Sequence, residues 1–380
     1  MKIAILSITQ NGISGGYKKY LNNIIPLISG SKEVDEVLCV FSNSIKKLFV
    51  DQKIAGVQYK SCKNLTLLNY FFNKELYKFL EEFDPDIIFL TAERPFKFKK
   101  VPVVVLFQDM RPFIKNGSDF SFINKIKLQL KKRISLMSFQ MADKVITVSD
   151  SCKFYLKKEL KINSDKINYI YYGVNPCEQS FKPTIVPDDW KNKFIFTAGS
   201  FGSYRGFEDL IKAFTLFDFN QLGIKGIVIA SNLNDVEKKY KAYLDKLIAK
   251  HNLNSKVIWT DEISEPEMTW CYSNSQLFIM TSRVESIGMI ALEALAHKCR
   301  IISARNFCLP EIFAEAALYY TPKDSEMLAN VIKDAIAMTR VAKEEFVEKV
   351  EKQAMMFSWD KCLMETISNF NSILQTKTFK

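Results

Sequence analysis

The stretch "QLFIMTSRVESIGMIALEALA", residues 276–296, contains a strand-like run followed by a helix-like run. The first part, "QLFIMTS", is apolar and short enough for a buried strand, and "IGMIALEALA" is rich in strong helix formers. Two carboxylates, Glu285 and Glu293, stand eight positions apart with Gly288 between them. A buried strand that leads into a helix is typical of a parallel α/β sheet.

The same alternation extends outward in both directions. Strand-like runs such as "KIAILSI" and "VPVVVLF" alternate with helical ones in the first half, a proline-bearing stretch over 176–190 interrupts the pattern, and it restarts at "KFIFTAGS". We therefore predict an α/β fold of two Rossmann-like, doubly wound domains, 1–176 and 177–360, facing a central cleft. A final helix over 361–380 is expected to pack back on the N-terminal domain.

Composition limits the classes of partner and site. The chain has 380 residues and a net charge of +11, which favours an anionic partner. Eight cysteines without a C-x-x-C pair, with only two histidines, argue against a zinc site. No apolar run reaches the roughly 18 residues of a membrane span, and the N-terminal apolar stretch is short for a signal peptide. We expect a cytoplasmic protein whose contact with a membrane, where it occurs, is peripheral at the inner face.

A basic helical stretch, residues 122–140, has two interpretations. Apolar side chains recur on one face, namely Ile123, Ile126, Leu130, Ile134 and Met137. Basic side chains are interleaved with them, namely Lys125, Lys127, Lys131, Lys132 and Arg133. The apolar face either packs on the protein's own sheet or lies on a membrane surface with anionic headgroups.

The loops that precede helices suggest a phosphate site. Gly12, Gly15 and Gly16 follow the first strand, although their spacing matches neither the dinucleotide fingerprint nor the Walker motif. In the opening stretch Ser282 is a candidate cap, and backbone amides over 286–289 at a helix start favour a diphosphate. On a continuous helix Glu285 and Glu293 would lie about 12 Å apart. That separation suits two parts of one long ligand better than a catalytic carboxylate pair, which needs about 5–9 Å.

The segment "VESIGMIALEALA" resembles the E-x7-E motif of glycosyltransferase family 4, the retaining enzymes of the GT-B fold. The similarity continues in order along nearly the whole chain, through "NGISGGYKKYL", "ADKVITVSDSCKFYL", "YYGVN", "AGSFGSYRGFEDLIKAF", "LPEIFAEAALYYTPKD" and "FSWDKC". The resemblance implies that the N-terminal domain binds the acceptor and that the C-terminal domain binds a nucleotide-sugar donor.

The resemblance also implies roles for individual residues. Glu293 would accept hydrogen bonds from the ribose hydroxyls, Glu285 would contact the donor sugar, and Arg205 would neutralise the diphosphate. The other implied donor contacts are Gly16, Gly199, Gly206, Ser286, Ile287, Gly288 and Met289. No metal ion or other cofactor is implied, because a cation and helix amides can stabilise the leaving diphosphate.

Several positions depart from the family pattern. Ser200 stands where a second basic residue is usual, and Gln108 replaces a histidine beside Asp109 in "FQDMRPF". We take Asp109 as a catalytic candidate, with Gln108 and Arg111 as candidates for binding the acceptor. The pair Asp84 and Asp86 mimics a D-x-D metal motif, but its place before a strand indicates turn chemistry.

The predicted function is that of a retaining glycosyltransferase. It would move a hexose-type sugar from a nucleotide diphosphate sugar to a glycan or lipid-linked acceptor, in the synthesis of a bacterial surface polysaccharide. The alternatives are another GT-B enzyme, such as an epimerase or a phosphorylase, and a non-catalytic protein that binds anionic ligands or nucleic acid. Nucleic acid is a poor fit as a partner, because the basic residues are dispersed and no nucleic-acid motif occurs.

Overall fold

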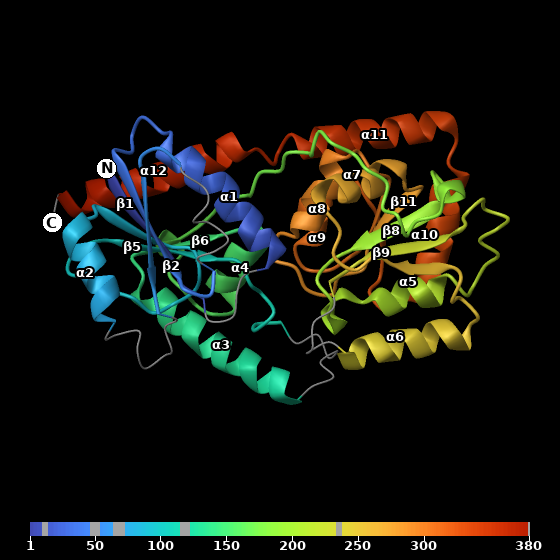
Figure 1. Cartoon of the computed structure of the whole chain (residues 1–380), viewed down its shortest axis with the longest axis horizontal. Helices are drawn as coiled ribbons and strands as arrows, with labels where there is room; N and C mark the ends of the chain where they lie inside the picture. The colour runs from blue at the N-terminus through green and yellow to red at the C-terminus, as the bar shows by residue number, and fades with distance from the viewer. Residues whose placement is uncertain (10–13, 46–53, 64–72, 115–121, 233–237, 379–380) are drawn as a thin grey trace. The chain divides into compact units, whose positions relative to one another are not determined.

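The computed structural model describes residues 1–9, 14–45, 54–63, 73–114, 122–232 and 238–378, which form two compact units (Figure 1). Unit 1 contains Met1–Phe113, Ile126–Gly173 and Ser358–Lys380, and unit 2 consists chiefly of Val174–Phe357. The change of unit near Gly173 lies three residues before the predicted boundary at 176. The return to unit 1 at Ser358 also precedes the predicted start of the last segment, at 361, by three residues.

Unit 1 is an α/β unit whose strands are all parallel. Over its described residues the strands are β1 (Lys2–Ser7), β2 (Glu36–Ser42), β3 (Val57–Cys62), β4 (Ile87–Leu90), β5 (Val103–Phe107), β6 (Lys144–Thr147) and β7 (Ile167–Tyr169). The connecting helices are α1 (Gly15–Ser29), α2 (Lys74–Phe83), α3 (Phe122–Met141) and α4 (Asp150–Lys158). The order β3-β2-β1-β4-β5-β6-β7 reverses between β1 and β4, which is where ligands bind in such sheets.

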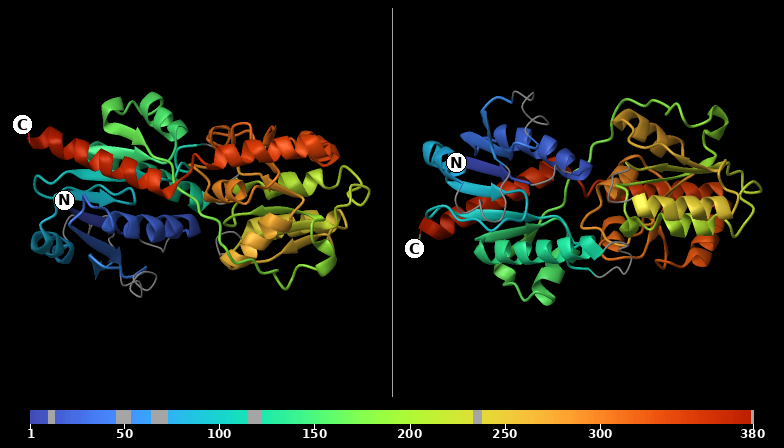
Figure 2. Two further views of the ribbon diagram at one scale, coloured as in Figure 1. Left: turned by 90° about the horizontal axis from the view of Figure 1, so that it is seen from above. Right: turned by 60° about the horizontal axis from the view of Figure 1, so that its bottom comes forward.

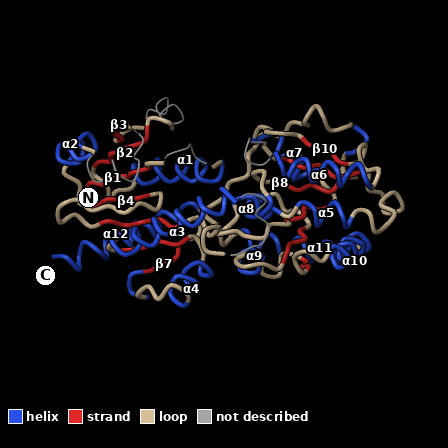
Figure 3. Tube along the Cα trace, turned by 90° about the horizontal axis from the view of Figure 1, so that it is seen from below, coloured by secondary structure: helices blue, strands red, loops and turns tan. Residues whose placement is uncertain are grey.

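The C-terminal helix α12 (Trp359–Thr378) completes unit 1 and packs against α1 (Figure 3). At its start Trp359 lies over a stacked pair of rings, Tyr20 and Tyr172, whose centroids are 4.4 Å apart. Gly173 is required beside this cluster, because a Cβ atom there would lie 2.2 Å from the backbone nitrogen of Trp359. The apolar core of unit 1 is therefore closed by a segment that follows unit 2 in the chain.

Unit 2 repeats the architecture with a second parallel sheet. Its described strands are β8 (Phe194–Ala198), β9 (Gly226–Ala230), β10 (Val257–Trp259), β11 (Leu277–Met280), β12 (Ile301–Ala304) and β13 (Leu318–Tyr320). Its described helices are α5 (Phe207–Ala213), α6 (Lys238–Lys250), α7 (Glu265–Asn274), α8 (Met289–Ala296), α9 (Leu309–Phe313), α10 (Ser325–Ala337) and α11 (Arg340–Ala354). The order β10-β9-β8-β11-β12-β13 reverses between β8 and β11. Both sheets are thus doubly wound, as predicted.

Helix α3 was expected either to pack its apolar face on the sheet or to expose it to a membrane. The accessibility of three apolar residues distinguishes these possibilities. Ile126, Leu130 and Met137 are exposed, with 54%, 49% and 44% of their surface accessible. The side that packs inward instead buries Ser138 and Phe139. Of the two interpretations, packing on the sheet is therefore excluded for Ile126, Leu130 and Met137. Helix α3 itself runs along the outside of unit 1 (Figure 2).

Among the helices of the described residues, none combines the length and the apolar character needed to span a bilayer.

Candidate functional site

The predicted donor residues of unit 2 meet at the carboxyl ends of β8 and β11. Arg205 lies in the loop after β8, and its guanidinium forms an ion pair with the carboxylate of Glu285, which follows β11. The same guanidinium donates to Ser282 Oγ at 3.1 Å and to Ser200 Oγ at 3.3 Å. Both members of the pair are nearly buried, with side-chain exposures of 12% and 11%. Ser200, which takes the place of a basic residue, therefore helps to orient Arg205.

Two glycines allow the loop after β8 to hold Arg205 in this place. Gly206 has a φ of +65°, and a Cβ atom there would lie 2.7 Å from the carbonyl oxygen of Thr281. Gly199 has a φ of +149°, and a Cβ atom there would lie 2.8 Å from Nε of Arg205. The Thr281 hydroxyl also donates to the Arg205 carbonyl oxygen at 2.6 Å. The backbone of this loop is thus joined directly to the end of β11.

A buried ion pair beneath the loop was not predicted from the sequence. Arg283 donates from Nη1 to Asp209 Oδ2 at 2.5 Å and from Nη2 to Asp209 Oδ1 at 2.8 Å, and their side chains are 4% and 3% exposed. Arg283 also pairs with Glu208 at 2.9 Å, and Asp209 accepts from the Tyr320 hydroxyl at 3.1 Å. The backbone nitrogen of Arg283 bonds to the carbonyl oxygen of Tyr204 at 2.6 Å. The signal that could have found this pair is an acidic start of α5 opposite an arginine after β11.

Helix α8 starts later than the sequence suggested. Its N-cap is Gly288, with a φ of +77° and a ψ of +81°, and Ala291 N–H donates to the Gly288 carbonyl oxygen at 2.8 Å. Ser282 is not the cap, because its hydroxyl is held by Arg205. Glu285 precedes the helix, so helical rise does not set its distance from Glu293. The first amides of α8 have no partner within the helix, as at every helix start.

Glu293 is fixed by aromatic and imidazole neighbours. The Tyr272 hydroxyl donates to Glu293 Oε2 at 2.9 Å. Burial, reinforced by the Glu293 carboxylate, raises the pKa of Tyr272 well above its ordinary value, so this hydroxyl keeps its proton. The His297 ring stacks on the Tyr272 ring with centroids 4.9 Å apart, and its Nδ1 lies 2.8 Å from the Glu293 carbonyl oxygen. His297 thus closes the end of α8.

In unit 1, Asp109 is a fully engaged carboxylate. Its oxygens accept hydrogen bonds from Arg111 N at 3.0 Å, Nε at 2.9 Å and Nη2 at 2.8 Å, and from Lys131 Nζ at 2.6 Å. Burial by itself would raise the pKa of Asp109, but the charges of Arg111 and Lys131 outweigh it and hold the pKa well below its usual range. Asp109 is therefore ionised at neutral pH and ties α3 to the end of β5.

Gln108 is held at both ends of its side chain. Nε2 donates to the Thr91 carbonyl oxygen at 2.8 Å, and Oε1 accepts from the Tyr172 hydroxyl at 3.0 Å. Its backbone nitrogen donates to Glu93 Oε1 at 3.1 Å. Among the predicted glycines of unit 1, Gly16 lies in the first turn of α1, next to Tyr17, whose backbone nitrogen is capped by Ser14. Gly12 lies outside the described residues.

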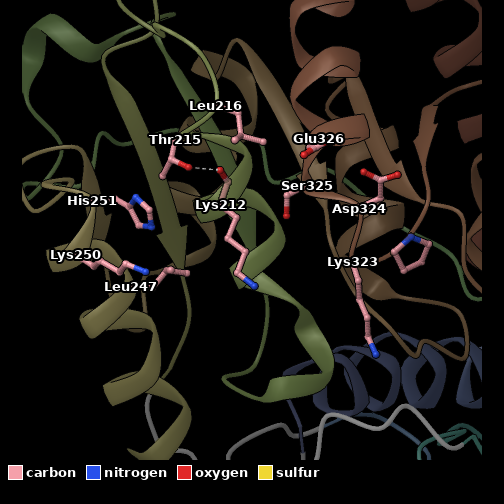
Figure 4. Close-up of a pocket in the computed structure, with 11 residues that line it drawn as sticks. Lys212, Thr215, Leu216, Leu247, Lys250, His251, Lys323, Asp324, Ser325 and Glu326 are labelled. Carbon is pink, nitrogen blue, oxygen red and sulfur yellow. Dashed lines mark hydrogen bonds between the residues drawn. The ribbon is translucent and has the colours of Figure 1, made fainter.

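Two further features lie outside the site. Asp84 is the left-handed C-cap of α2, and Asp86 accepts from the backbone nitrogen of Lys2 at 2.7 Å, which confirms turn chemistry for this pair. Unit 2 also has a cavity of about 760 Å³ where the ends of α5 and α6 approach the start of α10 (Figure 4). Lys212, Lys250 and Lys323 line it together with acidic side chains, and no predicted site residue does so.

Comparison with known proteins identifies the family. The model of the glycosyl transferases group 1 matches residues 179–354, and that of Glycosyltransferase Family 4 matches residues 34–178. The O-antigen chain mannosyltransferase RfbU of Salmonella typhimurium is 24% identical over 226 residues, 60% of this chain and 58% of RfbU. The serotype-specific mannosyltransferase WbdA of Escherichia coli is 21% identical over 253 residues, 63% of this chain and 30% of WbdA. The matches thus span less than two thirds of either relative.

Solved structures agree on the fold. A sucrose-phosphate synthase from Thermosynechococcus elongatus aligns with a TM-score of 0.76 at 14% identity, over 99% of both chains. The Anabaena protein HepE, solved in complex with UDP-glucose, aligns with a TM-score of 0.72 at 16% identity, over 98% of this chain and 100% of HepE. Since the two adjacent family models together match residues 34–354, the chain belongs to the family 4 glycosyltransferases and has the GT-B fold.

Proposed function

We propose that this glycosyltransferase moves a hexose-type sugar, with retention of the anomeric configuration, from a nucleotide diphosphate sugar to a saccharide acceptor. The observation that carries the proposal is the meeting of Arg205 and Glu285 at the strand-order reversal of unit 2, ahead of the start of α8. A cation, a carboxylate and helix amides at one sheet edge fit a sugar bonded to a diphosphate. The solved complex of HepE with UDP-glucose supports this class of donor.

Each group has a role in the proposed reaction. Glu293, oriented by Tyr272, accepts hydrogen bonds from the ribose, and Glu285 accepts them from the donor sugar. The bond from the sugar's anomeric carbon to the diphosphate oxygen breaks while the bond to the acceptor oxygen forms on the same face. The acceptor proton passes to the departing phosphate. Arg205 and the first amides of α8 stabilise the charge that develops there, so the proposal needs no metal ion.

A direct test measures donor binding and turnover. A thermal-shift series with UDP-, GDP- and ADP-sugars should reveal one nucleotide that stabilises the protein most. Arg205→Ala should then lower turnover by roughly a hundredfold or more. Arg340→Ala is the matched control, because Arg340 is 90% exposed and pairs with Glu344 on the surface of α11. Equal turnover in Arg205→Ala and Arg340→Ala would remove Arg205 from the reaction.

Glu293→Ala tests the ribose role separately. It should weaken binding of the free nucleotide diphosphate as much as that of the nucleotide sugar, because the lost contact is with the ribose. Unchanged nucleotide affinity would contradict the assignment.

The acceptor and the place where the protein acts are inferred from α3. We propose that the protein acts at the inner face of a membrane, on a lipid-linked saccharide of a bacterial surface polysaccharide. Ile126 and Leu130 form an exposed stripe one helical turn apart, and α3 has no acidic residue. Lys125, Lys127 and Arg133 are exposed on the same helix. An apolar stripe among basic side chains fits the surface of an anionic bilayer. The mannosyltransferases among its relatives, one of them an O-antigen enzyme, support the pathway.

Vesicle sedimentation tests the membrane part. The protein should bind vesicles that contain phosphatidylglycerol and not vesicles of phosphatidylcholine alone. The double variant Ile126→Ser, Leu130→Ser should lose most of this binding. Met355→Ser is the control, because Met355 is 80% exposed in unit 2. Undiminished binding by the α3 variant would exclude this surface.

A further inference from the structure

Polar side chains also gather at the strand-order reversal of unit 1. The reaction proposed above assigns them no role. Ser7 at the end of β1 shares a hydrogen bond of 2.6 Å with Thr91, just beyond β4. The Tyr17 hydroxyl, from α1, also lies 2.6 Å from Thr91 Oγ1. The first bond joins the carboxyl ends of β1 and β4, where the strand order reverses, and the second attaches α1 to the same point. A ligand of unit 1 is expected at this edge for the same topological reason as in unit 2.

Glu93 is the carboxylate at this edge. It stands three residues beyond β4, and only 5% of its surface is exposed. Oε1 accepts the backbone N–H of Gln108, the first residue after β5. Among the residues that the structure describes, no side chain or backbone group donates a hydrogen bond to Oε2. The second oxygen of this nearly buried side chain can therefore accept a hydrogen bond from a ligand or from water.

The other polar candidates of this edge are already committed. The Asp109 oxygens receive four hydrogen bonds from Arg111 and Lys131. The Gln108 amide is bonded at both ends. Of the three neighbouring polar side chains, Glu93 therefore has the greatest remaining capacity to accept a hydrogen bond.

The two sheets place Glu93 and Glu285 in comparable positions. Each sheet reverses its order between its first strand and the strand that opens the second half, which is β4 in unit 1 and β11 in unit 2. Glu93 follows β4 by three residues, and Glu285 follows β11 by five. Each carboxylate thus lies in the loop that follows the strand next to the reversal point, β4 in unit 1 and β11 in unit 2.

We propose that Glu93 binds the acceptor, with Oε2 accepting a hydrogen bond from a hydroxyl group of the acceptor saccharide. This assignment rests on the proposed glycosyl transfer and names the acceptor-binding carboxylate of the same reaction. A carboxylate suits this purpose because the hydroxyl groups of a sugar donate hydrogen bonds. Each such bond is stronger when the oxygen that accepts it belongs to a charged group. Gln108 holds the carboxylate in place through its backbone N–H, so it acts as a positioning residue.

The test compares Glu93→Gln with Asp188→Asn, which changes a carboxylate that is 94% exposed in unit 2. The acceptor is the member of a panel of nitrophenyl hexosides that the wild-type protein glycosylates fastest with its best donor. Glu93→Gln keeps an oxygen that can accept from Gln108 N–H but loses the charge. It should raise the acceptor KM about tenfold or more, leave the donor Kd unchanged, and leave the melting temperature within a degree or two of wild type.

Each outcome bears on one claim. An unchanged acceptor KM in Glu93→Gln, or an equal increase in Asp188→Asn, would overturn the assignment while leaving transfer intact. A parallel loss of donor affinity and melting temperature would show a structural role for Glu93 and would also overturn it. A wild-type protein that binds donor but glycosylates no member of the panel would contradict the saccharide acceptor on which the assignment depends. A wild-type protein that binds no nucleotide sugar would contradict the proposed function itself.

Discussion

Arg283 and Asp209 form a two-pronged ion pair in the interior of unit 2, with both side chains less than 5% exposed. Arg283 comes from the segment after β11 and Asp209 from the first turn of α5, so the pair joins the two chain segments that carry Glu285 and Arg205. Asp209 also accepts the backbone N–H of Lys323 at 2.9 Å, which attaches the start of α10 to the same point. The proposed donor site therefore rests on one buried carboxylate.

Arg283→Met should be strongly destabilising. Removing the cation leaves Asp209 charged, buried and without its main partner, which costs about 3–5 kcal/mol of unfolding free energy. Equilibrium denaturation in urea measures this loss. Arg340→Ala is the comparison, because its surface pair with Glu344 is worth less than about 1 kcal/mol. Similar losses in the two variants would contradict a structural role for the buried pair.

Gly206→Ala should weaken donor binding as well as stability. The left-handed backbone at φ +65° costs a residue with a side chain about 1 kcal/mol, and the new methyl group would also press against the Thr281 carbonyl oxygen. Gly223→Ala separates the two effects, since Gly223 has a φ of +69° with no atom near the added methyl group. We expect both variants to lose stability in thermal denaturation and only Gly206→Ala to lose nucleotide affinity in calorimetry. Equal nucleotide affinities would show that the contact with Thr281 does not position Arg205.

Tyr272→Phe should lower nucleotide affinity without unfolding unit 2. The variant removes the hydroxyl that orients Glu293 and keeps the ring that stacks on His297. Without this hydroxyl the Glu293 carboxylate is no longer held in one orientation. If Glu293 binds the ribose, a weakening of that contact by about 1.4 kcal/mol raises the Kd about tenfold. Isothermal calorimetry with the best nucleotide measures the change. The comparison is Tyr319→Phe, whose hydroxyl donates to the Ala314 carbonyl oxygen and should not affect Kd.

Asp109→Asn should change how stability depends on pH. The folded-state pKa of Asp109 lies below its unfolded value, so the ionised carboxylate stabilises the protein above the unfolded pKa of about 4. This stabilisation is lost as the pH falls below about 4 toward the folded pKa. At pH 7 the variant should lose about 1–3 kcal/mol of unfolding free energy. The loss is no larger because Arg111 and Lys131, the partners of Asp109, are partly exposed and can be rehydrated.

Wild type and Asp109→Asn should therefore differ less in their free energies of unfolding when urea denaturation is carried out below pH 4. Asp188→Asn, which affects a carboxylate 94% exposed beside Lys182, should show no comparable pH-dependent difference. A constant difference for Asp109→Asn from pH 7 to pH 3 would contradict the ion-pair explanation.

Local pattern was sufficient for much of the fold. The apolar run of β11 and the helix formers of α8 were visible in the sequence, as was the final helix, predicted over 361–380 and observed over Trp359–Thr378. By contrast, α11 was not predicted, because its charged run buries only Phe346 and Val350 and has little apolar periodicity. The edge strand β3 was missed for a similar reason, since it alternates partly buried and exposed residues.

The site required contacts that no local pattern contains. Lys131 is distant in the chain from Asp109, so the sequence could not show that this carboxylate is neutralised. The same limit applies to Arg283 and Asp209, which are joined only when β8 and β11 become neighbours. In the sequence, Glu93 is simply the first charged residue after a strand. The hydrogen bond that it accepts from Gln108 becomes visible only in the structure. The helical period of α3 was clear, but which face is buried depends on the sheet beneath it.

The packing of Trp359 against Gly173 has a consequence for biosynthesis. A ribosome makes the strands of unit 1 first, then all of Val174–Phe357, and only afterwards the helix α12 that completes unit 1. Unit 2 can therefore reach its folded state on the ribosome while unit 1 still exposes the apolar surface of α1 that α12 later covers. During synthesis, unit 1 therefore lacks one of its own helices until the last residues of the chain have been made.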